Sequence, residues 1–251
     1  MIKINIAIIG YGAMGKLVEK FAKEKGITVS SIIDPVAEGA THKEINVESL
    51  DGADVCIEFS LPDAAMENIK KVAELGKDHV MATTGWLDNV EEAKRIISKS
   101  ETGFIYASNF SIGVNAFYRI VRIAAKIFNN LPDYDVSAYE LHHKRKKDSP
   151  SGTAKSIGSL LIKNIDRKTK LVFDKLDRKI ASDELHFASV RGGDVPGTHV
   201  VDFDSTADTI ELKHTARNRN GFALGALLAA EWISDKKGFF EINDMMVEII
   251  K

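Results

Sequence analysis

The sequence has a single cysteine, Cys56, and this scarcity excludes an internal disulfide and any cysteine-based metal cluster. So little cysteine is what a reducing cytoplasm would predict. A long apolar run is also missing, because the longest one, residues 222–233, contains Glu231 and is too short to span a bilayer. Residues 1–6 lack the basic start and the apolar block of a signal peptide. We therefore expect a cytoplasmic protein without a membrane span.

An excess of one charge is absent too. The 251 residues include 34 Lys and Arg against 36 Asp and Glu, a formal net charge of −2. Without a broad basic excess the chain cannot hold a phosphate backbone over a large surface, which argues against nucleic acid as the partner. No internal repeat or low-complexity segment is visible. A hydrophobic share of 44% fits a globular protein of one or two domains.

The first residues predict a βαβ unit with a dinucleotide-binding turn. Residues 3–9 end in a continuous apolar run, as a buried parallel strand does, and the glycine turn Gly10–Gly15 follows at once. Apolar residues then recur at helical spacing up to Gly26, and a strand over 29–33 ends at Asp34. In G-x-G-x-x-G spacing, the glycines permit the tight turn, the approach of a pyrophosphate, and close packing of helix on strand. The helix start supplies N–H donors to the phosphates.

Asp34 also bears on the choice of cofactor. It stands nineteen residues after Gly15, where an acid accepts hydrogen bonds from the adenine ribose. A carboxylate there repels a 2′-phosphate, and Pro35 occupies the place of an arginine that could clamp one. The sequence therefore predicts NADH in preference to NADPH. His42 and Lys43 are the nearest cations that could reverse this preference, although exposed loop residues are their simpler interpretation.

Strands and helices alternate over the first hundred residues, which predicts a doubly wound parallel sheet. The expected strands are 55–59, 80–82 and 104–106, with helices beginning at Ser60 and at Glu91. Ligands of such sheets lie beyond the carboxyl ends of the strands. Three loops leave those ends and together outline a groove for the nicotinamide: Phe59-Ser60, Ala82-Thr83-Thr84-Gly85, and Ala107-Ser108-Asn109-Phe110.

The pattern changes near Gly113, where a long helix begins. The segments expected after it are a strand ending at Leu141, a helix over 154–164, and strands over 171–173, 186–191, 198–205 and 209–215. Consecutive strands predict an α+β domain with an open mixed or antiparallel sheet. Residues 222–233 and 239–250 are expected to be helical and to return to the first domain. The predicted domains are thus 1–112 with 221–251, which binds the dinucleotide, and 113–220, which binds the substrate and mediates oligomerisation.

The stretch Glu140–Thr153 puts two adjacent histidines, four cations and a helix start into fourteen residues. A run of Lys and Arg is usually a solvated face or a nucleic-acid patch. Here Asp148 and Pro150 close the run, and a Ser-Gly-Thr helix start follows it. Imidazoles, ammonium groups and the free N–H groups of a helix start together suit a small acidic substrate that needs protons delivered.

These residues resemble a known family. The stretch Glu140–Ala154 closely resembles the signature of dihydrodipicolinate reductases, and the likeness covers nearly the whole chain. The segments that follow the family's order are the glycine turn and residues 82–85, 109–115, 190–194 and 214–216. The central motif is specific, whereas the glycine turn alone would not be.

The resemblance implies the 4-hydroxy-tetrahydrodipicolinate reductase reaction of lysine and diaminopimelate synthesis, in which NADH or NADPH reduces a cyclic dicarboxylate. Hydride passes from nicotinamide C4 to a ring carbon, water is lost overall, and a positioned acid protonates the ring. His142 matches the family's proton donor and acceptor. Lys146 matches its second proton donor, whose charge also stabilises the developing anion. His143 matches a substrate contact, and Gly152 with Thr153 matches the pair that binds a substrate carboxylate.

The resemblance also implies the cofactor contacts and a homotetramer joined through the sheet of the second domain. The matching cofactor residues are Gly10, Tyr11, Gly12, Ala13, Met14, Gly15, Asp34, Ala82, Thr83, Thr84, Ala107, Ser108, Asn109 and Phe110. Two departures concern phosphate contacts and NADP use, not the reaction. Many members have a longer glycine turn containing a basic residue, which Lys16 replaces in part here, and many have an arginine at the position of Pro35.

Two other functions fit the residues. One is a two-domain NAD(P)-dependent dehydrogenase of amino or hydroxy acids, for which the Gly152–Thr153 carboxylate site would be superfluous. The other is a non-catalytic protein that senses a dinucleotide and turns its basic run toward a nucleic acid or a partner. No metal site is expected, because the remaining histidines lack ligand spacing; they are His42, His79, His186, His199 and His214.

Overall fold

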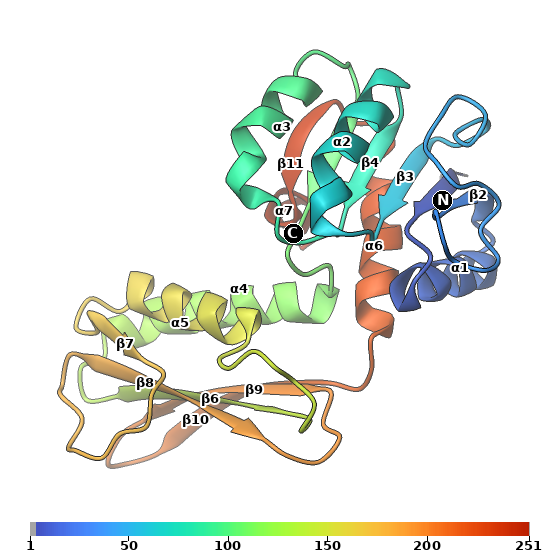
Figure 1. The fold of residues 1–251 in the computed structure, drawn as a ribbon. Helices are drawn as coiled ribbons and strands as arrows, with labels where there is room; N and C mark the ends of the chain where they lie inside the picture. Colours follow the sequence, from blue (N-terminus) through green and yellow to red (C-terminus); the bar gives the residue numbers. More distant parts are fainter. Residues whose placement is uncertain (1–3, 251) are drawn as a thin grey trace. The chain divides into compact units, whose positions relative to one another are not determined.

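The computed structural model describes residues 4–250, and it divides into two compact units (Figure 1). One unit ends at Ile112 and resumes at Asn220, and the other is Gly113–Arg219. The domain limits and roles expected from the sequence remain a prediction. Residues 1–3 and 251 lie outside the described part of the chain. Within residues 4–250, no helix is both long and apolar enough to cross a bilayer.

The first unit is built on a six-stranded, all-parallel sheet in the order β11-β5-β4-β3-β1-β2. Its strands are β1 (Asn5–Ile9), β2 (Thr28–Ile33), β3 (Val55–Glu58), β4 (Asp78–Met81), β5 (Gly103–Tyr106) and β11 (Gly238–Glu241). Its helices are α1 (Ala13–Lys25), α2 (Ala65–Glu74), α3 (Val90–Ile97), α6 (Asn220–Ile233) and α7 (Ile242–Ile249), with short 3₁₀ turns η1 (Pro62–Ala64) and η2 (Leu87–Asn89). The doubly wound parallel sheet is confirmed.

Helices cover both faces of this sheet. In β1, Ala7 belongs to the cluster that includes Val72 of α2, while Ile8 faces Gly15 of α1. Adjacent residues of a strand point to opposite faces, so α1 and α2 lie on opposite sides. Every residue of β3 and β4 is buried, as expected for strands covered on both faces.

The prediction of a helix over 239–250 is wrong for its first residues. Gly238–Glu241 form β11, which pairs in parallel with β5, and Phe239 stacks on Phe104 with ring centroids 4.9 Å apart. Helix α7 begins only after Glu241, which forms a reciprocal capping box with Asp244. A four-residue apolar run has no measurable period, and its pairing with β5 is a contact distant in sequence.

The second unit is a five-stranded mixed sheet in the order β10-β9-β6-β8-β7, packed against two helices. Its elements are α4 (Ile112–Asn129), β6 (Asp135–His142), α5 (Gly152–Asn164), β7 (Lys170–Val172), β8 (Glu184–Arg191), β9 (Gly197–Asp204) and β10 (Thr209–Ala216). The central strand β6 runs parallel to β8 and antiparallel to β9. The predicted α+β unit with a mixed sheet is confirmed.

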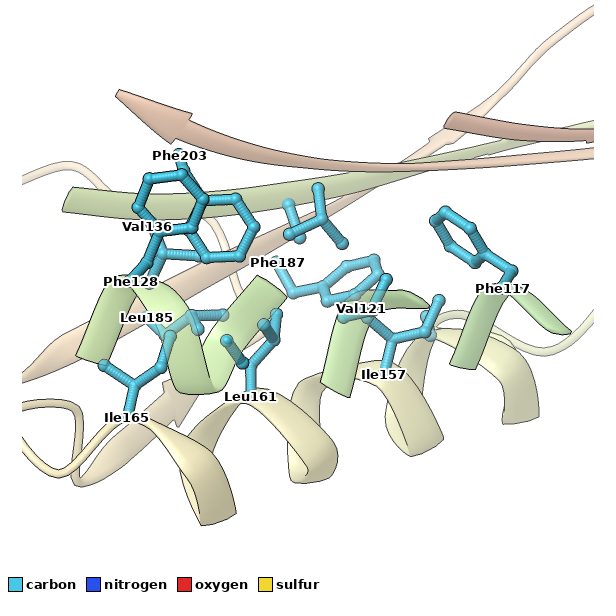
Figure 2. Close-up of a cluster of buried hydrophobic side chains, with 14 residues drawn as sticks. Phe117, Val121, Phe128, Val136, Ile157, Leu161, Ile165, Leu185, Phe187 and Phe203 are labelled. Atoms are coloured by element: carbon cyan, nitrogen blue, oxygen red, sulfur yellow. The ribbon is translucent and has the colours of Figure 1, made fainter. Parts of the chain in front are cut away.

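The core of this unit lies between the two helices and one face of the sheet (Figure 2). Phe128 of α4 stacks on Phe203 of β9 with centroids 4.2 Å apart, and Ile157 of α5 is fully buried. Strand β6 contributes Val136 and Ala138 to this face. Because alternate strand residues share a face, the next two residues in that phase are Glu140 and His142, which are also buried. The core face of β6 therefore ends in two ionisable side chains.

Candidate active site

Glu140 is a fully buried carboxylate at the end of β6. Its Oε1 atom accepts hydrogen bonds from Ser151 N at 2.9 Å, from Ser189 Oγ at 2.9 Å and from Arg191 Nη2 at 2.8 Å. These donors come from the start of α5 and from β8. Burial opposes the ionisation of Glu140, but bonds from His199, Ser151 and Arg191 outweigh it and hold its pKa below the ordinary value. The carboxylate is therefore ionised.

Two imidazoles approach the other oxygen of this carboxylate. Glu140 Oε2 lies 3.3 Å from His142 Nδ1 and 3.4 Å from His199 Nε2. The two imidazole rings pack edge to face, with their centroids 5.1 Å apart. The Nε2 edge of His142 lies against Gly197, where a Cβ would come within 2.9 Å of that nitrogen. Only glycine leaves Nε2 this room, so the two ring nitrogens have different surroundings.

The charge state of His142 is set by its surroundings. Burial lowers its pKa to about 4; the Glu140 carboxylate raises it, whereas His199, Lys146 and Arg191 lower it. At neutral pH the imidazole of the free protein is therefore neutral. An anionic ligand beside the ring would raise the pKa again, because an added negative charge favours imidazolium.

The start of α5 lies next to this cluster because Glu140 accepts Ser151 N–H. Ser151 is the N-cap, and its hydroxyl accepts the N–H of Ala154. The N–H groups of Gly152 and Thr153 are in the first turn, where a helix offers them no internal acceptor. A Cβ on Gly152 would meet nothing within 4 Å, so its backbone is open to a ligand. The first turn of α5 holds no acidic residue, which keeps it attractive to an anion.

The segment between β6 and α5 carries His143 and Lys146. Its backbone is tied to the link between β8 and β9, since His143 N donates to Val195 O at 2.8 Å and Gly192 N donates to His142 O at 2.9 Å. The Nδ1 atom of His143 is shielded from solvent and has no hydrogen-bond partner among the described residues. Lys146 Nζ pairs with Asp148 Oδ1 at 2.7 Å. The structure thus brings His142, Lys146 and the start of α5 into one neighbourhood.

The cluster also has the spacing of metal ligands, which the sequence did not indicate. Ligand atoms of Glu140, His142 and His199 all lie within 4.8 Å of one another. The guanidinium of Arg191, 2.8 Å from the carboxylate, already supplies the positive charge that a metal ion would bring. Ionic repulsion from Arg191 disfavours a dication at this position.

The glycine turn of the first unit has the geometry that its spacing predicts. Gly10 has φ of 88°, and a Cβ there would lie 2.3 Å from Phe59 O. A Cβ on Gly15 would lie 2.2 Å from Gly10 O, whereas one on Gly12 would meet nothing within 4 Å. Gly12 is the N-cap of α1 and provides no side-chain cap, and the first turn holds no acid. This helix start, with Ala13 and Met14 in its first turn, fits the phosphates of a dinucleotide.

Asp34 follows β2 and is held by the backbone. Its Oδ2 accepts Tyr11 N–H at 2.8 Å, and its Oδ1 accepts the N–H groups of Val36 at 3.0 Å and Ala37 at 2.8 Å. Partial burial opposes ionisation, but these three bonds lower the pKa of Asp34 below its ordinary value. An anchored, ionised carboxylate therefore stands beside the glycine turn. His42 reaches the same strand end, where Asp34 N donates to His42 O at 3.0 Å.

The three predicted loops lie at the carboxyl ends of β3, β4 and β5. Thr83 is buried, and its Oγ1 accepts Ser60 N–H at 2.8 Å, which joins two of the loops. The third loop spans Ala107, Ser108, Asn109 and Phe110, of which Phe110 is buried and Ser108 exposed. Behind them Glu58 accepts Asn68 Nδ2 at 2.9 Å and the Ser60 hydroxyl. Ala82 and Thr84 flank Thr83 in the loop that follows β4.

Sequence reasoning missed the residues that surround His142. His199 and Arg191 come from β9 and β8, about fifty residues away, and no local pattern joins them to β6. Glu140 was part of the motif but received no role. Its signal was the phase of β6, since an acid on the buried face of a strand needs a partner.

A doubly wound sheet with this glycine turn, accompanied by a unit with a buried acid–imidazole cluster, defines a two-unit NAD(P)-dependent oxidoreductase. Family models agree: the N-terminal part of dihydrodipicolinate reductase matches residues 4–110, and the C-terminal part matches residues 113–246. The chain belongs to the dihydrodipicolinate reductase family.

Individual relatives extend over the full length. The 4-hydroxy-tetrahydrodipicolinate reductase of Christiangramia forsetii is 38% identical over 248 residues, covering 99% of this chain and 100% of the relative. That of Archaeoglobus fulgidus is 38% identical over 262 residues, covering 97% and 100%. The dihydrodipicolinate reductase of Paenisporosarcina sp. TG-14 shares the fold, with a TM-score of 0.79 and 20% identity over 97% of this chain and 99% of that one.

The surroundings of His142 predict an unusual titration. We expect its imidazole to titrate near pH 4 in the free protein, because burial lowers its pKa. The unfolded chain takes up this proton at a higher pH than the folded chain. The stability contributed by neutral His142 is therefore complete above about pH 6.5 and decreases as the pH falls toward 4. NMR titration of the ring, assigned with His142→Gln, measures the midpoint, and a midpoint near 6.5 would contradict the burial argument.

Proposed function

We propose that the chain is a 4-hydroxy-tetrahydrodipicolinate reductase, a cytoplasmic enzyme of lysine and diaminopimelate synthesis. The observation that carries the proposal is the juxtaposition of His142 with the open helix start at Gly152, in a chain whose full-length relatives carry that name. The Paenisporosarcina relative was solved with dipicolinate bound, and that ligand is a small dicarboxylate. A dicarboxylate needs both an anion site and a proton donor.

The proposed roles follow from the local geometry. The N–H groups of Gly152 and Thr153 bind one substrate carboxylate, helped by the positive end of the α5 dipole. The negative charge of the bound substrate raises the pKa of His142, which then gives its proton to the ring as electron density builds up. Lys146 stabilises the developing charge and serves as the second proton donor. His143, in the same segment as Lys146 and only partly buried, supplies a further polar contact to the substrate.

The first unit fits a nicotinamide dinucleotide, which supplies the hydride when bound. Gly12 leaves the approach to the α1 start open, and the N–H groups there receive the pyrophosphate. Asp34 accepts the ribose hydroxyls, and its fixed negative charge disfavours a 2′-phosphate. We propose that NADH is preferred over NADPH for this reason. Thr83 and Asn109, at the ends of β4 and β5, border the nicotinamide.

The reaction is tested by following the absorbance of NADH and NADPH with substrate freshly made from pyruvate and aspartate semialdehyde. We expect His142→Gln and Lys146→Met each to lower kcat about 100-fold or more, the range of a lost general acid, with NADH affinity nearly unchanged. Lys147→Met, which removes an exposed neighbouring cation, is the matched control and should keep wild-type turnover. Full activity of both variants would show that the acid and the cation are assigned wrongly.

The cofactor preference is tested at Asp34. Replacing the carboxylate in Asp34→Asn removes charge-assisted bonds to the ribose, so NADH affinity should fall about tenfold, while the ratio of NADPH to NADH use rises. Asp51→Asn, at an exposed carboxylate of the same unit, should change neither. Steady-state kinetics with both cofactors measure the ratio, and a wild-type enzyme that already prefers NADPH would refute the preference.

We also propose a homotetramer joined through the sheet of the second unit. Helices α4 and α5 cover one face of that sheet. On the other face Tyr139 and Val190 are 37% and 51% exposed, although both are apolar enough to be buried by a partner. Sedimentation equilibrium should give four times the chain mass, and a monomeric mass would contradict the proposal.

A further inference from the structure

The buried acid of β6 has a geometry that points to a role in the reaction. Glu140 and His142 share one face of the strand because they are two residues apart. Their side chains therefore emerge side by side, with Nδ1 of the imidazole 3.3 Å from Oε2 of the carboxylate. We propose that Glu140 is a positioning residue that fixes the tautomer and the orientation of His142 and holds the substrate-binding end of α5 against it. This inference rests on the proposed function of His142.

The distribution of donors over the carboxylate supports a proton on Nδ1. Oε1 receives three donors, from Ser151, Ser189 and Arg191. Oε2 receives none of these, and the groups within ion-pair distance of it are the imidazoles of His142 and His199. His199 Nε2 also lies 3.3 Å from the Ser151 hydroxyl, whereas Glu140 Oε2 and His142 Nδ1 are both buried without a hydrogen-bond partner among the described residues. Two such atoms 3.3 Å apart satisfy each other when the proton is on Nδ1, so we expect Nδ1–H of His142 to point at Oε2. The Nε2 atom, beside Gly197, is then the nitrogen that exchanges protons.

At 3.3 Å the two atoms are within ion-pair distance but do not form a hydrogen bond in this structure. Catalytic hydrogen bonds are often long in the unliganded protein and shorten in the substrate complex. When His142 gains a proton, it becomes a cation beside an ionised carboxylate, and the attraction between them shortens this distance. Glu140 thus stabilises the protonated imidazole at the moment when the reaction requires it, in the manner of an acid that orients a catalytic histidine.

Arg191 makes the arrangement possible and extends it. Its Nη2 donates to Glu140 Oε1 and to the backbone oxygen of Asp148, at 2.8 Å in both cases. The side-chain carboxylate of Asp148 pairs in turn with Lys146. The carboxylate is thereby balanced by a cation and connected to the segment that carries the second proposed donor. At the same time Glu140 accepts Ser151 N–H, next to Gly152. The buried Glu140 side chain therefore connects three parts of the site: the imidazole of His142, the segment that carries Lys146, and the start of α5.

Glu140→Gln is the decisive variant, because it keeps the shape and removes the charge. We expect kcat to fall about 10- to 100-fold, as large as the loss when the partner that orients a metal-bound histidine is removed, with NADH affinity unchanged. The pH profile of kcat should also move to lower pH, because the Glu140 charge raises the pKa of His142. The other charged groups facing the ring are His199 of β9, Arg191 of β8 and Lys146 of the following segment.

The chain offers a matched control in Glu184. This carboxylate is also buried in the same sheet and is paired with an arginine, with both Arg178 nitrogens at 2.8 Å. Glu184→Gln should leave kcat and its pH profile unchanged, even if it lowers stability. A folded Glu140→Gln protein with wild-type kcat and pH profile would overturn the proposal. Equal losses in both variants would also overturn it, because the loss would then be a general effect of a broken ion pair.

A measurement on the wild-type protein keeps the proposal testable if Glu140→Gln does not fold. Nitrogen-15 NMR of the histidine rings at pH 7, without substrate, reports which nitrogen of His142 carries the proton. We expect the proton on Nδ1, and a proton on Nε2 would overturn the proposal. Because no turnover is needed, this result is independent of the proposed reaction: an inactive protein with Nδ1–H would refute the function and leave the positioning intact.

Discussion

The second unit depends on the burial of one ionised carboxylate, Glu140, near the end of the central strand of its sheet. Moving such a charge out of water costs on the order of several kcal/mol of free energy even after the protein relaxes around it. The surrounding structure must therefore supply partners. They come from separate elements: Arg191 and Ser189 from β8, and Ser151 from the start of α5. Each partner fixes the position of its own element relative to β6. The requirement to stabilise one buried charge thus determines how the end of the sheet is assembled.

The fold could be predicted from the sequence where the signal is local. Strands β1, β3 and β5 each contain a continuous apolar run. The glycine turn between β1 and α1 has one structural solution, since a side chain at Gly10 or Gly15 would clash with Phe59 O or Gly10 O. Strand β11 could not be predicted in the same way. Its four residues carry no period, and they form a strand only because β5, more than a hundred residues earlier, offers an open edge. The capping box at Glu241 was a local signal for the start of α7, and it was overlooked.

The residues of the candidate site also fall into two groups, those with a local sequence signal and those without one. His142, Lys146 and the start of α5 lie within a dozen residues, so a motif could identify them. Arg191 and His199 join them only because β8 and β9 flank β6 in the sheet, a relation that no sequence spacing expresses. The alternation of side chains along β6 was nevertheless informative. Its buried face carries Val136, Ala138, Glu140 and His142, so it changes from apolar to ionisable residues. Ionisable residues on a buried face indicate a functional site.

Both units use the same physical device at a helix start. Acids in the first turn occur in α2, α3 and α7, where they stabilise the helix dipole, whereas α1, α4, α5 and α6 have none. Beside the starts of α1 and α5 stands a carboxylate that accepts a nearby backbone N–H: Asp34 takes that of Tyr11, and Glu140 takes that of Ser151. Each acid thereby orders the backbone without neutralising the open N–H groups that follow. A helix start built in this way stays available to an anionic ligand, because its own charge is left uncompensated until the ligand binds.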